Sequence, residues 1–230
     1  VKAIAASPQR PNRLLIAGAS SDELQHCYLE AWIGMARSLP LVLPQLQMAV
    51  VGRDQPSSMS QWAQTVYEVL SVSSYQSRFY QGETAHIHRL RSITVDVTEP
   101  VLKTGGSYLI TGGCGGLGYQ IAQHLARHYA ARVTLLGRSP VDARIESQLA
   151  ALRTMGGQAH YAQADVCNER QLSAALETAR EHMGAFHGLV HAAGIQGAET
   201  ILERNPEDFQ RVLDIKINGS LLLDQALQLS

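Results

Sequence analysis

In the second half of the chain, apolar residues form short runs of strand length, separated by longer stretches with helical period. The predicted strands are Tyr108–Thr111, Val133–Leu136, His160–Ala164 and Leu189–Ala192. The predicted helices span residues 118–129 and 143–155, a segment from Asn168 through Met183, and a segment that starts at Asn205-Pro206. Strands that alternate with helices predict an α/β fold with a doubly wound, Rossmann-like parallel sheet.

The first hundred residues show a weaker version of the same pattern. We predict a strand in "RLLIAGAS", a helix in "ELQHCYLEAWIGMARSL", a strand at 48–51, a helix at 62–70 and a hairpin formed by 77–80 and 85–90. The stretch "EPVLKTGG" separates this part from the next, so we predict a degenerate α/β structural subdomain at 1–104 and a cofactor-binding subdomain at 105–230. Gly18 is the only glycine in the first strand-to-helix turn, which favours a structural role over a second cofactor site.

A glycine cluster, "TGGCGGLG", joins the strand at 108–111 to the helix that follows. Glycine allows positive φ and has no Cβ, so backbone N–H groups at a helix N-terminus can approach a pyrophosphate. The alternative is a tight strand-to-helix turn without a ligand, but the strand–loop–helix context favours a dinucleotide. The candidate residues of this loop are Thr111, Gly112, Gly113, Gly115, Gly116, Leu117 and Gly118.

The end of the second strand of this half carries Gly137, Arg138 and Ser139, where a site for NAD usually has a carboxylate. A guanidinium offers charge-assisted hydrogen bonds to a 2′-phosphate, and Ser139 adds a further donor. The sequence therefore predicts NADPH as the cofactor rather than NADH. The alternative for Arg138 is a solvated surface charge.

Two further strand ends are expected to reach the same crevice, because ligands of open α/β sheets bind at the carboxyl ends of the strands. Asp165 and Val166 are candidates for contacts with adenine, although Asp165 is equally compatible with a helix-entry turn. The segment "HAAG" brings small residues to the place where a ribose must approach. It consists of His191, Ala192, Ala193 and Gly194, and a histidine in such a place is more often a core residue than a ligand.

Composition and charge narrow the classes of function. The formal net charge is -1 with no block of like charge, which argues against nucleic acid or a membrane surface as partner. Cys27, Cys114 and Cys167 are too few and too scattered for a disulfide framework or a CxxC metal site. Neither a signal peptide nor an apolar run of transmembrane length is visible. We expect a soluble cytoplasmic protein without a bound metal.

From Tyr108 onwards the chain resembles the short-chain dehydrogenase/reductase superfamily, and within it the ketoreductase domain of modular polyketide synthases. The motifs that carry the resemblance are "YLITGGCGGLG", "LLGRS", "ADVCN", "GLVHAAG" and "PEDFQRVLDIKINGS". The first hundred residues are similar to that family's structural subdomain, in "GMARSLPLVLPQLQMAVVGRD" and "WAQTVYEVL".

The resemblance implies hydride transfer from NADPH to the β-keto group of an acyl chain tethered to an acyl carrier protein, beside other polyketide synthase domains. It also implies that Lys216, in "LDIKING", is the family's catalytic-helix lysine, for which the alternative is a solvated helix lysine. A Leu-Asp-Asp stretch marks one product configuration in this family. Its place is taken here by Gln196, Gly197 and Ala198, which implies the L-hydroxy product.

The chain departs from the family in one respect. The family's catalytic serine and tyrosine lie beyond the matching segment, and none of the eight tyrosines has Tyr-x-x-x-Lys or Tyr-x-x-x-Asn spacing. We therefore expect the N-terminal portion of a longer ketoreductase domain, inactive by itself. Two alternatives stay open: a non-catalytic nucleotide-binding or interaction module, and a free-standing reductase of a diffusible carbonyl compound.

Overall fold

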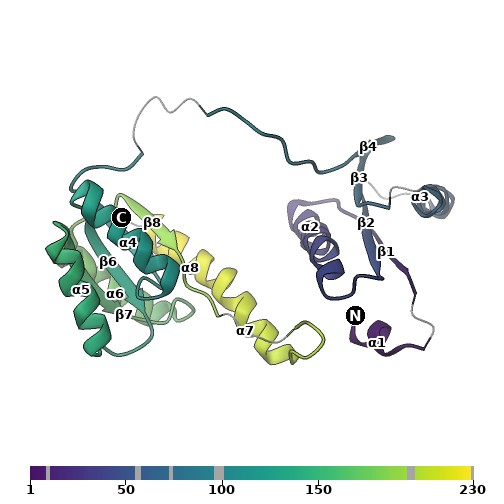
Figure 1. Ribbon diagram of the computed structural model, residues 1–230. Helices are drawn as coiled ribbons and strands as arrows, with labels where there is room; N and C mark the ends of the chain where they lie inside the picture. The colour runs from purple at the N-terminus through teal and green to yellow at the C-terminus, as the bar shows by residue number, and fades with distance from the viewer. Residues whose placement is uncertain (9–10, 55–57, 73–74, 96–100, 196–199, 229–230) are drawn as a thin grey trace. The chain divides into compact units, whose positions relative to one another are not determined.

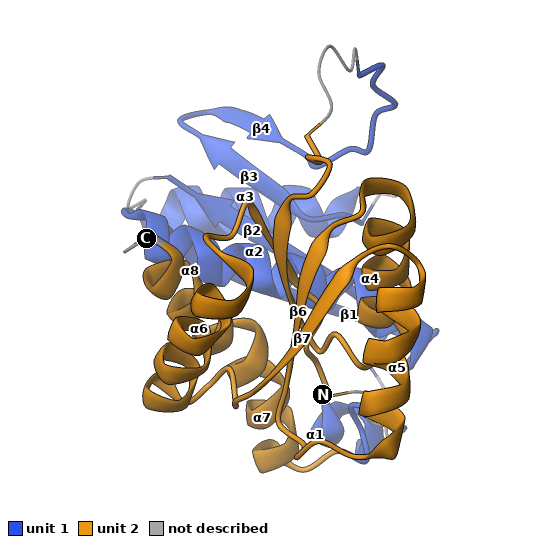
Figure 2. Ribbon diagram, turned by 90° about the vertical axis from the view of Figure 1, so that its left-hand side faces the viewer, with its two compact units in different colours: residues 1–95, 199–203 blue, residues 96–198, 204–230 orange. Residues whose placement is uncertain are grey.

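The computed structural model describes residues 1–8, 11–54, 58–72, 75–95, 101–195 and 200–228. Two compact units make up the chain (Figure 2). Unit 1 comprises Val1–Val95 and Glu199–Glu203, and unit 2 comprises Asp96–Ala198 and Arg204–Ser230. The predicted boundary at 104–105 lies between the last strand of unit 1 and the first strand of unit 2.

Unit 1 contains a four-stranded sheet in the order β1-β2-β3-β4. The first three strands are parallel, and β4 pairs with β3 in an antiparallel hairpin. The predicted second arm of this hairpin, 85–90, ends as a strand at His86. The elements are α1 (Lys2–Ala6), β1 (Arg13–Ala19), α2 (Glu23–Ser38), the 3-10 helix η1 (Leu39–Leu41), β2 (Gln47–Arg53), α3 (Met59–Ser71), β3 (Arg78–Gln81) and β4 (Thr84–His86).

The first strand-to-helix turn of unit 1 is closely packed, and the helix that follows it is capped by a carboxylate. A Cβ on Gly18 would lie 3.1 Å from Leu29 Cδ2, so the strand packs directly on α2. The carboxylate of Asp22 already accepts a hydrogen bond from the Gln25 N–H at the N-terminus of α2. Because a carboxylate there repels a phosphate, this geometry supports a structural role for unit 1.

Unit 2 contains a parallel sheet in the order β7-β6-β5-β8, as predicted from the alternation of strands and helices (Figure 1). Each predicted strand and helix is found, with ends within two residues of the prediction. The elements are β5 (Ser107–Thr111), α4 (Gly116–Tyr129), β6 (Arg132–Gly137), α5 (Ala143–Thr154), β7 (Gln158–Gln163), α6 (Glu169–Met183), β8 (Gly188–His191), α7 (Pro206–Lys216) and α8 (Asn218–Gln228).

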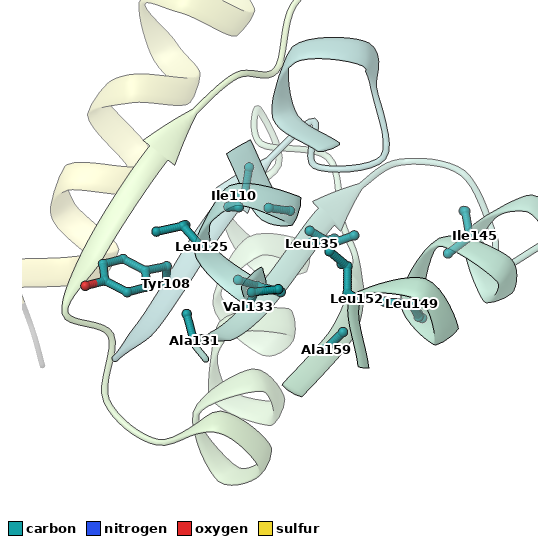
Figure 3. Close-up of a cluster of buried hydrophobic side chains, with 12 residues drawn as sticks. Tyr108, Ile110, Leu125, Ala131, Val133, Leu135, Ile145, Leu149, Leu152 and Ala159 are labelled. Carbon is teal, nitrogen blue, oxygen red and sulfur yellow. The ribbon is translucent and has the colours of Figure 1, made fainter. Parts of the chain in front are cut away.

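Helices cover both faces of this sheet. Successive residues of a strand point to opposite faces, so each strand packs against both layers of helices. In β5, Tyr108 and Ile110 pack with α4 and α5, whereas Leu109 packs with α6, α7 and α8. Figure 3 shows the first of these clusters, in which Leu125 of α4 and Leu152 of α5 face the strands. The two layers fix the strands rigidly and leave their carboxyl ends to form a site. In the described part of the chain, no helix is long and apolar enough to span a membrane.

Candidate cofactor site

The sheet of unit 2 reverses its strand order at β5, since β6 and β7 lie on one side of it and β8 on the other. In open α/β sheets the crevice at such a reversal is the usual ligand site. A pocket of about 170 Å³ lies at these strand ends. Seven of the predicted site residues line it, from all four strand ends: Gly112, Gly137, Arg138, Asp165, Val166, Ala193 and Gly194, together with Leu136, Ala164 and, from α7, Ile215. A larger pocket, of about 300 Å³, lies in unit 1 against α2 and β3 and contains none of the predicted residues.

The glycine loop needs glycine for two packing reasons. Gly112 has a φ of +64°, and a Cβ there would lie 2.8 Å from Ala193 Cα. A Cβ on Gly118 would lie 2.5 Å from the Gly112 oxygen. The Gly115 N–H donates to that same oxygen at 2.9 Å, which closes the loop into a tight turn. Side chains at these positions would force the backbone to move.

The N-terminus of α4 has no capping side chain and no acidic residue in its first turn. In contrast, α2, α3, α5, α6 and α7 are capped by Asp22, Ser58, Asp142, Asn168 and Asn205. The first intrahelical bond of α4 runs from the Tyr119 N–H to the Gly115 oxygen. The preceding N–H groups of Gly116, Leu117 and Gly118 therefore have no intrahelical acceptor. Free donors at a positive helix end suit an anion such as a pyrophosphate.

Arg138 and Ser139 follow β6 and are both exposed. The neighbouring strand fixes their backbone, because Gln163 Nε2 donates to the Arg138 oxygen at 3.2 Å and the Tyr161 hydroxyl donates to the Ser139 oxygen at 2.6 Å. Burial raises the pKa of Tyr161, so the hydroxyl remains a donor. The Arg138 guanidinium makes no hydrogen bond or ion pair within the described residues. The backbone of Arg138 is therefore held in place, while its guanidinium is available to a ligand at the pocket that Arg138 lines.

Asp165 fulfils the helix-entry role that the sequence left open. Its Oδ1 accepts from the Cys167 N–H at 2.9 Å, and its own N–H donates to Gln171 Oε1 at 3.1 Å. Asp165 also lines the pocket, so a contact with adenine is still compatible with this role. Val166 is buried and its side chain packs against Gly219, but the residue also lines the pocket.

Both ring nitrogens of His191 have partners within the protein. Nε2 lies 3.0 Å from the Ile215 oxygen, which can only accept, so we assign the proton to Nε2. Nδ1 must then accept from the Thr111 hydroxyl at 2.6 Å, and Thr111 Oγ1 accepts from the Ala193 N–H at 3.2 Å. His191 thus joins β5, β8 and α7. The geometry favours a core role for its ring, while the contact with a ribose stays a prediction.

Lys216 ends α7, and its Nζ donates to the Ala193 oxygen at 2.8 Å. A Cβ on Gly194 would lie 3.5 Å from Lys216 Cε, so the lysine side chain lies beside Gly194, which itself lines the pocket. The remaining members of the "HAAG" segment, Ala192 and Ala193, follow the strand with their small side chains. The Gln196–Ala198 segment, on which the product configuration was predicted, lies outside the described residues.

Two hydrogen-bonding contacts of this site were not predicted from the sequence. The Ile215 oxygen that holds His191 gives no signal in the sequence, because any residue provides a backbone carbonyl. Arg144 and Gln148 of α5 both donate to the Cys114 oxygen, at 2.9 and 3.3 Å. Their i, i+4 spacing places them on one helix face and could have indicated a shared contact.

A profile of the KR domain matches residues 106–230. The chain belongs to the KR domain family. Its relatives include polyketide synthase PksM of Bacillus subtilis, 40% identical over 231 residues, and polyketide synthase ThaG of Burkholderia thailandensis, 30% identical over 235 residues. The alignments cover 99% and 98% of this chain but only 5% and 4% of those synthases.

Solved ketoreductase domains share the fold. The crystal structure of a ketoreductase domain from the bacillaene assembly line has a TM-score of 0.80 at 25% identity, over 94% of this chain and 52% of that one. An N-terminal ketoreductase from the macrolactin assembly line has a TM-score of 0.70 at 25% identity, over 94% of this chain and 44% of that one. This KR chain therefore has the Rossmann-like fold of polyketide synthase ketoreductases, as the resemblance implied.

Proposed function

We propose that this KR chain binds NADPH and takes part in reducing a β-ketoacyl thioester, carried on an acyl carrier protein, to the β-hydroxyacyl thioester. Two observations at the strand-order reversal of the sheet carry the proposal together: the guanidinium of Arg138, unpaired within the described residues, lines the pocket with Gly112, and the N-terminus of α4, which follows the same loop, is uncapped. These features match the two phosphate positions that distinguish NADPH from uncharged ligands and from NADH.

The residues present fit this cofactor. A Cβ on Gly112 would collide with Ala193, and a Cβ on Gly118 with the Gly112 oxygen, so glycine keeps the loop in this shape. The N–H groups of Gly116, Leu117 and Gly118 have no intrahelical acceptor and suit a pyrophosphate. Arg138 and Ser139 would bind the 2′-phosphate, and the carboxylate of Asp165, which lines the pocket, would accept from the adenine amine. The small residues after His191 would allow a ribose to approach the end of β8.

A bound nicotinamide would supply the hydride for the ketone carbon. Negative charge then develops on the ketone oxygen and must be met by a cation or a hydrogen-bond donor. We assign this electrostatic role to Lys216, because its ammonium reaches the end of β8 while only one of its three donors is used, at the Ala193 oxygen. We assign the proton donor to no residue of this chain, since no tyrosine has the required spacing.

Cofactor choice tests the proposal directly. Arg138→Ala should weaken NADPH binding by about 1.5–3 kcal/mol, the range for a hydrogen bond to a charged group, and leave NADH binding nearly unchanged. Fluorescence titration with both cofactors measures this. Arg127→Ala is a matched control, because Arg127 is exposed near the opposite end of α4. Equal losses for NADPH and NADH would show that Arg138 is structural.

The substrate class needs a separate test with the synthase polypeptide that carries this chain. We expect NADPH-dependent reduction of a β-ketoacyl group on the carrier protein to be faster than reduction of the same acyl group on a small diffusible thiol. NADPH binding without reduction of either substrate would favour the non-catalytic module. Equal rates with both substrates would favour a reductase of diffusible carbonyl compounds.

A further inference from the structure

The carbonyl of Cys114 points towards α5, none of whose residues lines the pocket. This residue lies in the middle of the glycine loop, between Gly113 and Gly115. Its oxygen accepts from Arg144 Nη1 at 2.9 Å and from Gln148 Nε2 at 3.3 Å. The N–H of the same peptide group belongs to Gly115 and donates to the Gly112 oxygen. Contacts at both ends therefore fix the orientation of this peptide group.

That orientation matters for an anion in the loop. A carbonyl dipole aimed at the pocket would place partial negative charge beside a phosphate, whereas the observed orientation turns it away. The Nε2 of Gln148 donates to the Cys114 oxygen, whereas its Oε1 is buried without a partner within the described residues. Leaving a buried acceptor unpaired costs free energy, so the contact with Cys114 compensates for part of this cost.

Arg144 is suited to hold this carbonyl from outside the fold's core. It is exposed on the first turn of α5, which Asp142 caps through the Ile145 N–H at 2.7 Å. A guanidinium has five donors in a fixed plane, so one contact leaves others for water while the side chain stays oriented. The positive charge of Arg144 also lowers the pKa of Cys114, although burial has the larger effect and raises it.

Building on the proposed function, we infer that Arg144 and Gln148 are positioning residues for cofactor binding. They hold the Cys114 carbonyl outward and thereby keep the glycine loop in the shape that receives the pyrophosphate. Arg144 would thus affect the binding of the pyrophosphate, whereas Arg138 would contact the 2′-phosphate. The two arginines should therefore affect different parts of one ligand.

Three ligands separate these roles. NADPH has the pyrophosphate and the 2′-phosphate, NADH has only the pyrophosphate, and adenosine 2′-monophosphate has only the 2′-phosphate. Arg144→Ala should weaken NADPH and NADH by the same factor, about tenfold, and leave adenosine 2′-monophosphate unchanged. Arg138→Ala should weaken NADPH and adenosine 2′-monophosphate and leave NADH unchanged. Arg144→Lys keeps one donor for the carbonyl and should recover most of the loss.

Titration calorimetry with this panel, with Arg127→Ala as the control, decides the matter. A loss confined to NADPH and adenosine 2′-monophosphate would overturn the inference, because Arg144 would then bind the 2′-phosphate itself. Unchanged binding of all three ligands would also overturn it. A uniform loss together with a lower melting temperature would show a general structural role instead. If the unsubstituted protein binds neither dinucleotide, the proposed function fails, and this inference fails with it.

Discussion

Replacing Gly118 or Gly116 with alanine tests separately the two reasons for glycine in the first turn of α4, which are close packing against the preceding loop and space for a phosphate. A Cβ on Gly118 would lie 2.5 Å from the Gly112 oxygen and 3.0 Å from Gly113 Cα. Ordinary contact begins at 3.4 Å, and both neighbours are backbone atoms that cannot rotate away. The loop would have to move by about 0.9 Å, the difference between these distances. Overpacking of this kind costs about 1–3 kcal/mol of folding free energy.

The same displacement would move Gly112 and with it the cradle for the pyrophosphate. Since each hydrogen bond to a charged group contributes about 1.5–3 kcal/mol, losing the alignment of one N–H group should weaken NADPH by about tenfold or more. Gly118→Ala should therefore lose both stability and affinity.

Gly116 is different, because a Cβ there would meet no protein atom within 4 Å. Alanine at the first position of a helix removes backbone freedom from the unfolded chain and stabilises proteins by about 0.4–1 kcal/mol at compatible sites. A methyl group beside the free N–H groups of α4 would nevertheless obstruct a phosphate. Gly116→Ala should keep or raise the free energy of unfolding and weaken NADPH.

Urea denaturation measures the free energy of unfolding of each variant, and fluorescence titration measures NADPH affinity. Unchanged NADPH affinity in Gly116→Ala would refute our placement of the phosphate at the N-terminus of α4. Unchanged stability in Gly118→Ala would show that the loop adapts to the methyl group without strain.

Three further predictions concern the same unit and its product. Thr111→Val leaves His191 Nδ1 and the Ala193 N–H without partners, so it should cost about 1–3 kcal/mol of stability in urea denaturation, whereas Thr111→Ser, which keeps the hydroxyl, should cost less. Burial lowers the pKa of His160 from its ordinary 6.5, and the neighbouring His182 and Arg153 lower it further. The unfolded chain therefore binds the proton more readily, and the free energy of unfolding should fall as pH falls below about 6.5. His160→Gln should reduce this pH dependence, whereas His128→Gln, at an exposed position, should not. For the proposed reduction of a β-ketoacyl group we predict the L-hydroxy product, and a D-alcohol in chiral chromatography would contradict the prediction made from Gln196–Ala198.

The order of elements in unit 2 could be predicted because each element is marked locally. Asn168 and Asn205, at which two helical segments were predicted to start, cap α6 and α7 through the N–H groups of Gln171 and Asp208. The rule that ligands lie at the carboxyl ends of parallel strands then brought Gly112, Arg138 and Asp165 to one pocket without any knowledge of distances. Local signals and one rule of topology were sufficient for this part.

The roles of His191 and Lys216 could not be decided in that way, because they depend on contacts across distant elements. A sequence shows that each could be a core or surface residue, but not that the Ile215 oxygen lies beside His191 or that the Ala193 oxygen lies beside Lys216. The same holds for Arg144, whose partner is 30 residues away in the chain.

These contacts also connect Lys216 to the glycine loop. Thr111 lies at the end of β5, where the loop begins, and its Oγ1 accepts from the Ala193 N–H. The Ala193 oxygen in turn accepts from Lys216 Nζ. His191 joins Thr111 to the Ile215 oxygen, which lies one residue before Lys216. The lysine is thus held at its backbone and at its ammonium by groups that also fix the end of β5. A change at Thr111 should consequently alter the placement of Lys216 as well as the stability of the fold, which explains why the strand end and the helix end must be considered as one site.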